Sequence, residues 1–138
     1  MRPMKDKVFL DTNILIYVYS VTEPEKQKVA ADLSGNTGSY ISLQVIQELS
    51  NILNKKFQLN WGQILLAIEE LVENYSIVTN NFQIVKSACE LANKYQFSFY
   101  DSLIISAALE ANCNILFTED LQHNQLIENK LRIVNPFR

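Results

Sequence analysis

Short apolar runs alternate with amphipathic helical segments along the whole chain, and this alternation limits the folds that the chain can adopt. Strands are predicted at residues 7–10, 40–41, 76–79, 114–118 and 132–134. Helices are predicted at residues 13–19, 24–33, 43–54, 61–74, 81–95 and 98–111, with a short helix near residue 121. Such alternation favours an α/β fold, a three-layer α/β/α sandwich with a mostly parallel central sheet of about five strands.

The composition describes an ordinary globular chain. It has 138 residues with only three glycines and three prolines, and neither a repeat nor a linker-like segment interrupts the pattern. We therefore expect one domain over residues 1–138. The formal net charge is −3, so the chain lacks the excess of basic residues that many nucleic-acid binders have. If several carboxylates bind a cation, however, the remaining surface is near neutral, so the net charge does not decide the question.

Several classes of protein are excluded or disfavoured. The chain has no glycine-rich phosphate loop, which excludes a nicotinamide- or flavin-binding Rossmann protein. One histidine and two well-separated cysteines, Cys89 and Cys113, do not make a structural zinc site, and both cysteines are expected to be buried in helices. No signal peptide or membrane span is visible, so a cytoplasmic protein is expected.

Two acidic residues follow predicted strands. Asp11 comes directly after the first strand, and Asp120 comes shortly after the fourth. Because the carboxyl ends of parallel strands meet at one edge of a sheet, these two carboxylates are expected to lie close together. Glu119 is an alternative to Asp120 as the acid at this position. Asp120 is favoured because side chains alternate between the two faces of a strand, so Thr118 and Asp120 point the same way. The alternative is that both acids only stabilise turns or cap helices.

Two further acids lie on helices. Asp101 falls inside the apolar stripe of its predicted helix, where an unpaired charge is costly, although the helix dipole also favours an acid in the first turn. Ser102 lies outside that stripe and is expected at the surface. Glu48 projects roughly 40° outside the apolar arc of its own helix, a position that solvated acids also occupy.

Four carboxylates in one place repel each other and require a hard divalent cation. Their convergence would therefore indicate metal-dependent chemistry on phosphate. Thr12, Asn13 and Thr118 carry hydroxyl or amide groups beside the acids and are candidates for orienting the carboxylates or a bound water. Helix capping is the alternative role for these residues, and for Asn13 the two roles are equally favoured.

The segments around the acids carry a family resemblance. Four blocks contain the acids, in the order Asp11-Thr12-Asn13-Ile14-Leu15, Ser42-Leu43-Gln44-Val45-Ile46-Gln47-Glu48, Tyr100-Asp101-Ser102-Leu103-Ile104 and Leu116-Phe117-Thr118-Glu119-Asp120-Leu121-Gln122-His123. In this order they resemble the blocks of PIN-domain ribonucleases, most closely those of the VapC-type toxins of type II toxin–antitoxin systems. Each block is short, and the specificity comes from all four standing in order between about Val8 and Val134. The resemblance implies a PIN-like nuclease domain.

The resemblance also implies a mechanism and partners. Mg²⁺ or Mn²⁺ would be held by Asp11, Glu48, Asp101 and Asp120, with Asp11 and Asp101 as direct ligands and the other two acting through water or on a second ion. RNA would be hydrolysed to leave a 5′-phosphate and a 3′-hydroxyl. A VapB-like antitoxin and a homodimer are expected. His123 is not needed as a base, since a metal-bound water supplies the nucleophile.

The chain departs from many relatives at Tyr100, Ser102 and Asn124, which leaves the choice of RNA open. Two alternatives remain. A haloacid-dehalogenase-type phosphatase also has an aspartate after its first strand, but it needs a second aspartate where Asn13 stands. A PIN-like module without catalysis would bind RNA or protein only. The helix around Trp61, Ile64, Leu65 and Ile68 is a candidate dimer interface, although core packing is the favoured explanation for these residues.

Overall fold

The structure, a computed structural model, describes residues 6–35 and 38–138. Within those residues the strands form one six-stranded sheet in the order β3-β2-β1-β4-β6-β5. The strands are β1 (Val8–Leu10), β2 (Tyr40–Ser42), β3 (Ser76–Val78), β4 (Ile115–Phe117), β5 (Leu126–Ile127) and β6 (Leu131–Val134). Neighbouring strands are parallel, except that β5 and β6 are antiparallel. The predicted α/β fold with a mostly parallel sheet is confirmed, with one more strand than expected.

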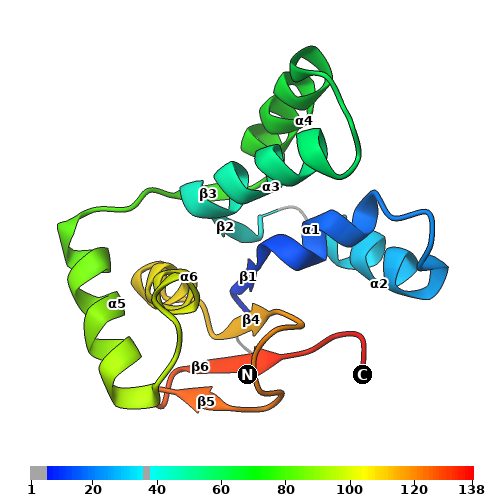
Figure 1. Cartoon of the computed structure of the whole chain (residues 1–138). Coiled ribbons are helices and arrows are strands. Elements are labelled where there is room, and N and C mark those ends of the chain that lie inside the picture. Colours follow the sequence, from blue (N-terminus) through cyan, green and yellow to red (C-terminus); the bar gives the residue numbers. More distant parts are fainter. Residues whose placement is uncertain (1–5, 36–37) are drawn as a thin grey trace.

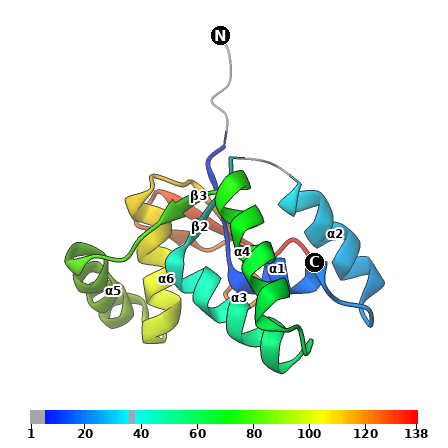
Figure 2. The same cartoon turned by 90° about the horizontal axis from the view of Figure 1, so that it is seen from above.

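Helices lie on both sides of this sheet. They are α1 (Thr12–Val18), α2 (Pro24–Ser34), α3 (Leu43–Lys55), α4 (Trp61–Asn74), α5 (Phe82–Tyr95) and α6 (Phe99–Glu110). Figure 1 shows α5 and α6 on one side of the strands and α1 and α2 on the other, with α3 and α4 beside β2 and β3. Figure 2 gives the same arrangement from above, with α3 and α4 between the two helix pairs.

Polar caps fix where several helices begin. The Ser42 hydroxyl accepts a hydrogen bond from the Val45 backbone N–H, which starts α3 at the residue after β2. Ser98 does the same for α6 by accepting from the Asp101 N–H. Asp11, the N-cap of α1, follows β1 without an intervening loop. Strand ends and helix starts are thus joined directly, which holds the residues at these junctions in fixed positions.

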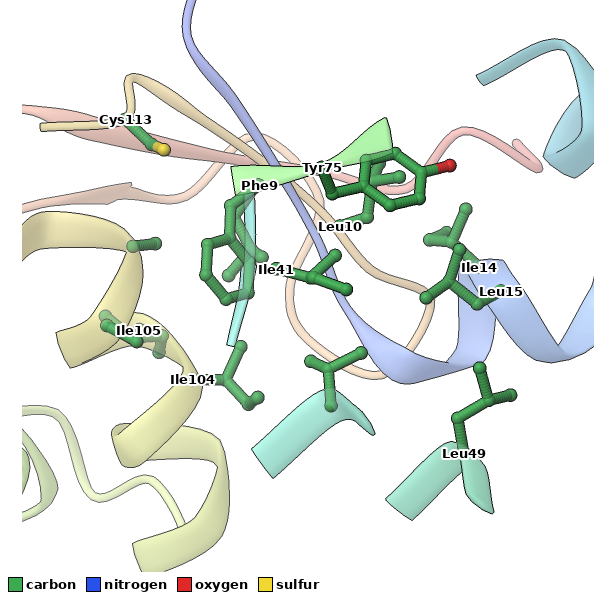
Figure 3. Packing of buried hydrophobic residues seen from close by; sticks show 14 of the residues in the cluster. Phe9, Leu10, Ile14, Leu15, Ile41, Leu49, Tyr75, Ile104, Ile105 and Cys113 are labelled. Atoms are coloured by element: carbon green, nitrogen blue, oxygen red, sulfur yellow. The ribbon is translucent and has the colours of Figure 1, made fainter. Parts of the chain in front are cut away.

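The core is continuous from β1 into the helices on both sides. Phe9 and Leu10 are fully buried, as expected for a central parallel strand that is covered on both faces. Figure 3 shows them between Ile105 of α6 and Ile14 of α1. Burying each such side chain contributes about 1.5–3 kcal/mol. The core therefore packs directly beneath the junction where Asp11 lies.

Three expectations about single residues are wrong. Ser102 is fully buried, because α6 packs against α5 on the side opposite the predicted apolar stripe. Cys89 is exposed on α5, and Cys113 is buried but lies after the end of α6.

The candidate dimer interface on α4 stays a prediction. Ile64 joins the core at 1% exposure whereas Trp61 is 63% exposed, so only part of that helix is available as an interface.

The chain between β4 and β6 also differs from expectation. The short helix predicted near Leu121 is absent, and bends and turns occupy residues 119–125. A hairpin follows, closed by Glu128 and Asn129, which both have positive φ angles of 50° and 56°. The Lys130 N–H donates to the Ile127 carbonyl at 2.9 Å, which closes a turn within the loop between the paired residues Ile127 and Leu131. Because this turn has no glycine, β5 gave no recognisable signal in the sequence.

Candidate active site

One pocket of about 190 Å³ lies at the carboxyl edge of the sheet. It collects residues from the β1–α1 junction and α1, from α3, from the N-terminal part of α6 and from the segment after β4. The pocket is lined by Asp11, Thr12, Asn13, Ile16, Gln44, Glu48, Ile52, Tyr100, Asp101, Ile104 and Asp120. All four acids singled out in the sequence therefore line the same pocket.

Asp11 is the most buried of these acids, with 6% of its surface exposed. Its Oδ1 accepts from the Thr12 backbone N–H at 2.7 Å, and its Oδ2 accepts from the Thr118 hydroxyl at 2.8 Å. Burial raises the pKa of Asp11 from 3.8 to about 6 in spite of these two hydrogen bonds. The negative charges of Glu48 and Asp120 make smaller contributions to the same increase in pKa. The acids of this pocket therefore repel one another.

The Thr118 hydroxyl connects two of the acids. It donates to Asp11 and accepts from the Asn13 amide at 3.2 Å and from the Asp120 backbone N–H at 3.2 Å. Asn13 also donates to Asp120 Oδ2 at 3.0 Å, and its own oxygen accepts from the Glu119 N–H at 3.3 Å. Thr118 and Asn13 thus hold the segment after β4 against the start of α1. Both of these predicted supporting residues contact the acids directly.

Glu48 is held from two directions. Its Oε2 accepts from the Thr12 hydroxyl at 3.1 Å, and its Oε1 accepts from the Gln44 amide at 2.7 Å. The same Gln44 nitrogen lies 3.3 Å from the Tyr100 carbonyl, which links α3 to the first turn of α6 beside Asp101. The side-chain oxygen of Gln44 is buried and has no hydrogen-bond partner among the described residues. Sequence reasoning missed Gln44, although a glutamine one helical turn before an acid is a recognisable pair.

The carboxylates of Asp101 and Glu119 have different surroundings. Asp101 is half-buried and lines the pocket, and no salt bridge to it is present among the described residues. Glu119 lies outside the pocket lining and pairs with Lys26 at 2.7 Å. Partial burial alone would raise the pKa of Glu119, but the hydrogen bond from Lys26 holds it below its ordinary value. The geometry therefore favours Asp120 over Glu119, as the strand-end alternation predicted.

The histidine of this region has a structural contact. His123 Nδ1 accepts from the Asn135 backbone N–H at 2.9 Å, which ties the segment after β4 to the residues after β6. His123 does not line the pocket.

The donor chemistry of the pocket fits a divalent cation. The acidic side chains of its lining are carboxylates of aspartate and glutamate, and none of the described residues that line it is a lysine or an arginine. Hard oxygen donors of this kind suit Mg²⁺ or Mn²⁺. Among the described residues, no three Asp, Glu, His or Cys side chains lie close enough to hold an ion together. The four carboxylates thus share the walls of one pocket without meeting at one point.

The sequence matches the family model of the PIN domain over residues 8–128. The chain belongs to the PIN domain family. This match spans the whole pocket, from the strand before Asp11 to beyond Asp120. No curated protein matches the chain significantly.

Solved structures of PIN proteins share the fold. A toxin–antitoxin complex from Klebsiella pneumoniae matches with 22% identity and a TM-score of 0.68, covering 94% of this chain and 98% of that one. VapBC-1 from nontypeable Haemophilus influenzae matches with 25% identity and a TM-score of 0.68, covering 95% and 98%. VapC20 from Mycobacterium tuberculosis, described as a sarcin–ricin loop cleaving toxin, matches with 15% identity and a TM-score of 0.64, covering 83% and 92%.

None of the helices in the described parts of the chain has both the length and the hydropathy of a membrane-spanning segment.

Proposed function

We propose that this PIN protein is a metal-dependent ribonuclease that hydrolyses RNA phosphodiester bonds, and that it is the toxin of a type II toxin–antitoxin pair. The observation that carries the proposal is the shared pocket of four carboxylates, with no lysine or arginine among its described lining residues. The toxin role is supported by the likeness to VapBC-1 and to VapC20. On the same grounds we propose a VapB-like antitoxin partner and a homodimer.

The residues present would hold Mg²⁺ or Mn²⁺ through Asp11 and Asp101, with Glu48 and Asp120 binding through water or a second ion. Bound there, the ion would supply a water of lowered pKa as the nucleophile and would neutralise charge on the phosphate. The protein's own part is orientation. Thr12, Asn13, Gln44 and Thr118 hold three of the carboxylates at fixed hydrogen-bonding distances. A fixed set of ligands avoids reorganisation during the reaction.

The test is the cleavage of total RNA in Mg²⁺ by the wild type and by Asp101→Asn, with the cut sites mapped. Glu110→Gln is the matched control, because Glu110 ends the same helix and is exposed away from the pocket. We expect Asp101→Asn to abolish cleavage while its far-UV circular dichroism spectrum stays unchanged, and Glu110→Gln to cleave normally. Equal cleavage by Asp101→Asn and wild type would refute the site.

The same assay distinguishes the alternatives. Hydrolysis of small phosphate monoesters without RNA cleavage would indicate a phosphatase. RNA binding without cleavage, together with no detectable Mn²⁺ binding, would indicate a module that has kept the fold without the activity.

A further inference from the structure

An exposed aromatic ring lies at the rim of the acid pocket. Tyr100 lines the pocket, directly precedes Asp101 in the first turn of α6, and is 68% exposed. Phe99 beside it is 42% exposed, and the two rings meet edge to face with their centroids 5.6 Å apart. The Tyr100 hydroxyl has no hydrogen-bond partner in residues 6–35 and 38–138. Neither core packing nor a polar contact therefore explains the position of this ring.

The backbone of Tyr100, in contrast, is held in place. Its carbonyl lies 3.3 Å from the Gln44 amide that also binds Glu48, and Ser98 caps the helix turn on which it stands. The ring is thus attached at a fixed point beside the carboxylates. A rigid attachment reduces the ordering cost of binding a flat ligand.

The charge of the protein limits how it can hold an anionic strand. Proteins usually bind nucleic acid through lysine and arginine contacts to phosphates. This chain has a net charge of −3, and its described pocket lining has no basic residue. Stacking of a base on an aromatic ring needs no opposite charge and contributes about 1–3 kcal/mol per base. Of the residues lining the pocket, Tyr100 is the aromatic one.

We propose that the Tyr100 ring, flanked by Phe99, stacks on a nucleobase next to the phosphate that enters the acid pocket. The inference rests on the proposed nuclease function and adds a base-binding position to it. A base must leave its duplex stack to offer its face to a side chain, so the nucleotide bound here is unpaired. The substrate is accordingly an RNA that is single-stranded at the cut.

The test compares Tyr100→Ala, Tyr100→Phe and Phe82→Ala on an unstructured oligoribonucleotide that contains a mapped cut site. Phe82 is the matched control, because it is 76% exposed on α5 and does not line the pocket. We expect Tyr100→Ala to lower kcat/KM about 5- to 150-fold, which is the loss of one stacked base. Tyr100→Phe keeps the ring and should stay within about twofold of the wild type, as should Phe82→Ala.

A second substrate separates stacking from structural damage. Two versions of the oligonucleotide each have an abasic position on one side of the cut. On one of these two strands, the kcat/KM of the wild type should fall by the same factor that Tyr100→Ala causes on the intact strand. The kcat/KM of Tyr100→Ala should fall little further on that abasic strand. A penalty that persists undiminished on both abasic strands would overturn the proposal.

Other outcomes also decide the question. If Tyr100→Ala cleaves the intact strand as well as the wild type, stacking is refuted while the nuclease function stands. If Tyr100→Ala changes only the sedimentation coefficient of the protein, the ring belongs to a protein interface and the proposal fails. If the wild type cleaves no RNA, the nuclease function fails and takes the base-binding position with it.

Discussion

Protonation of Asp11 should make the metal-free protein more stable at mildly acidic pH than at neutral pH. Burial raises the pKa of this carboxyl from 3.8 to about 6 in the folded protein. Between these two values the folded state holds a proton that the unfolded state lacks, so the free energy of unfolding falls as the pH rises through this window. The stabilisation is present below about pH 4 and is lost above about pH 6. The shift corresponds to about 3 kcal/mol.

The measurement is urea unfolding followed by far-UV circular dichroism between pH 4 and 7.5 in a chelator. Other carboxylates also titrate in this range, so the readout is the difference between variants. Asp11→Asn cannot titrate, and its free energy of unfolding should lack this part of the slope. Asp32→Asn, the same change at an exposed acid on α2, should keep the slope of the wild type.

Parallel pH profiles for the wild type and Asp11→Asn would refute the reasoning, whatever the offset between them. A slope of the opposite sign would show that the hydrogen bonds from Thr118 and Thr12 outweigh burial at this carboxyl. The effect of saturating Mg²⁺ on the free energy of unfolding is a second test. Mg²⁺ should stabilise the wild type most above pH 6, where the carboxylates are charged, and should stabilise Asp11→Asn less.

Five substitutions at four positions test how the acids are held and which residue is the fourth acid. Thr118→Val should weaken Mn²⁺ binding about 10- to 100-fold by calorimetry, whereas Thr118→Ser should bind as the wild type does, because only the hydroxyl contacts the carboxylates. Gln44→Met keeps the length but not the amide bound to Glu48, and should lower kcat about tenfold or more at saturating RNA. Glu119→Gln should retain cleavage and Asp120→Asn should lose it; the reverse result would reassign the fourth acid.

The sequence was sufficient for the fold class and for the convergence of the acids. Asp11 and Asp120 follow adjacent parallel strands, so topology alone brings them to one edge once β1 and β4 are recognised. Asp101 and Glu48 required only helical periodicity, since Asp101 falls inside the apolar stripe of its helix and Glu48 borders the apolar arc of its own helix. Local patterns with a fixed period are what a single sequence carries most clearly.

What the sequence did not reveal depends on the packing partner. A single apolar stripe predicts one buried face for α6 and places Ser102 outside that face. In the structure α6 lies between the sheet and α5 and is buried on more than one side. Gln44 looked like an ordinary polar residue until its contacts with Glu48 and the Tyr100 carbonyl were visible. The roles of both residues depend on a neighbouring element that is distant in sequence.

The order of the pocket residues along the chain has a consequence during synthesis. Asp11 and Glu48 leave the ribosome well before Thr118 and Asp120 do. A nascent chain that ends before β4 lacks both the strand that pairs with β1 and the hydroxyl that binds Asp11. Under the proposed nuclease function, a nascent chain would therefore be unable to cleave RNA until the segment that carries Thr118 and Asp120 has left the ribosome.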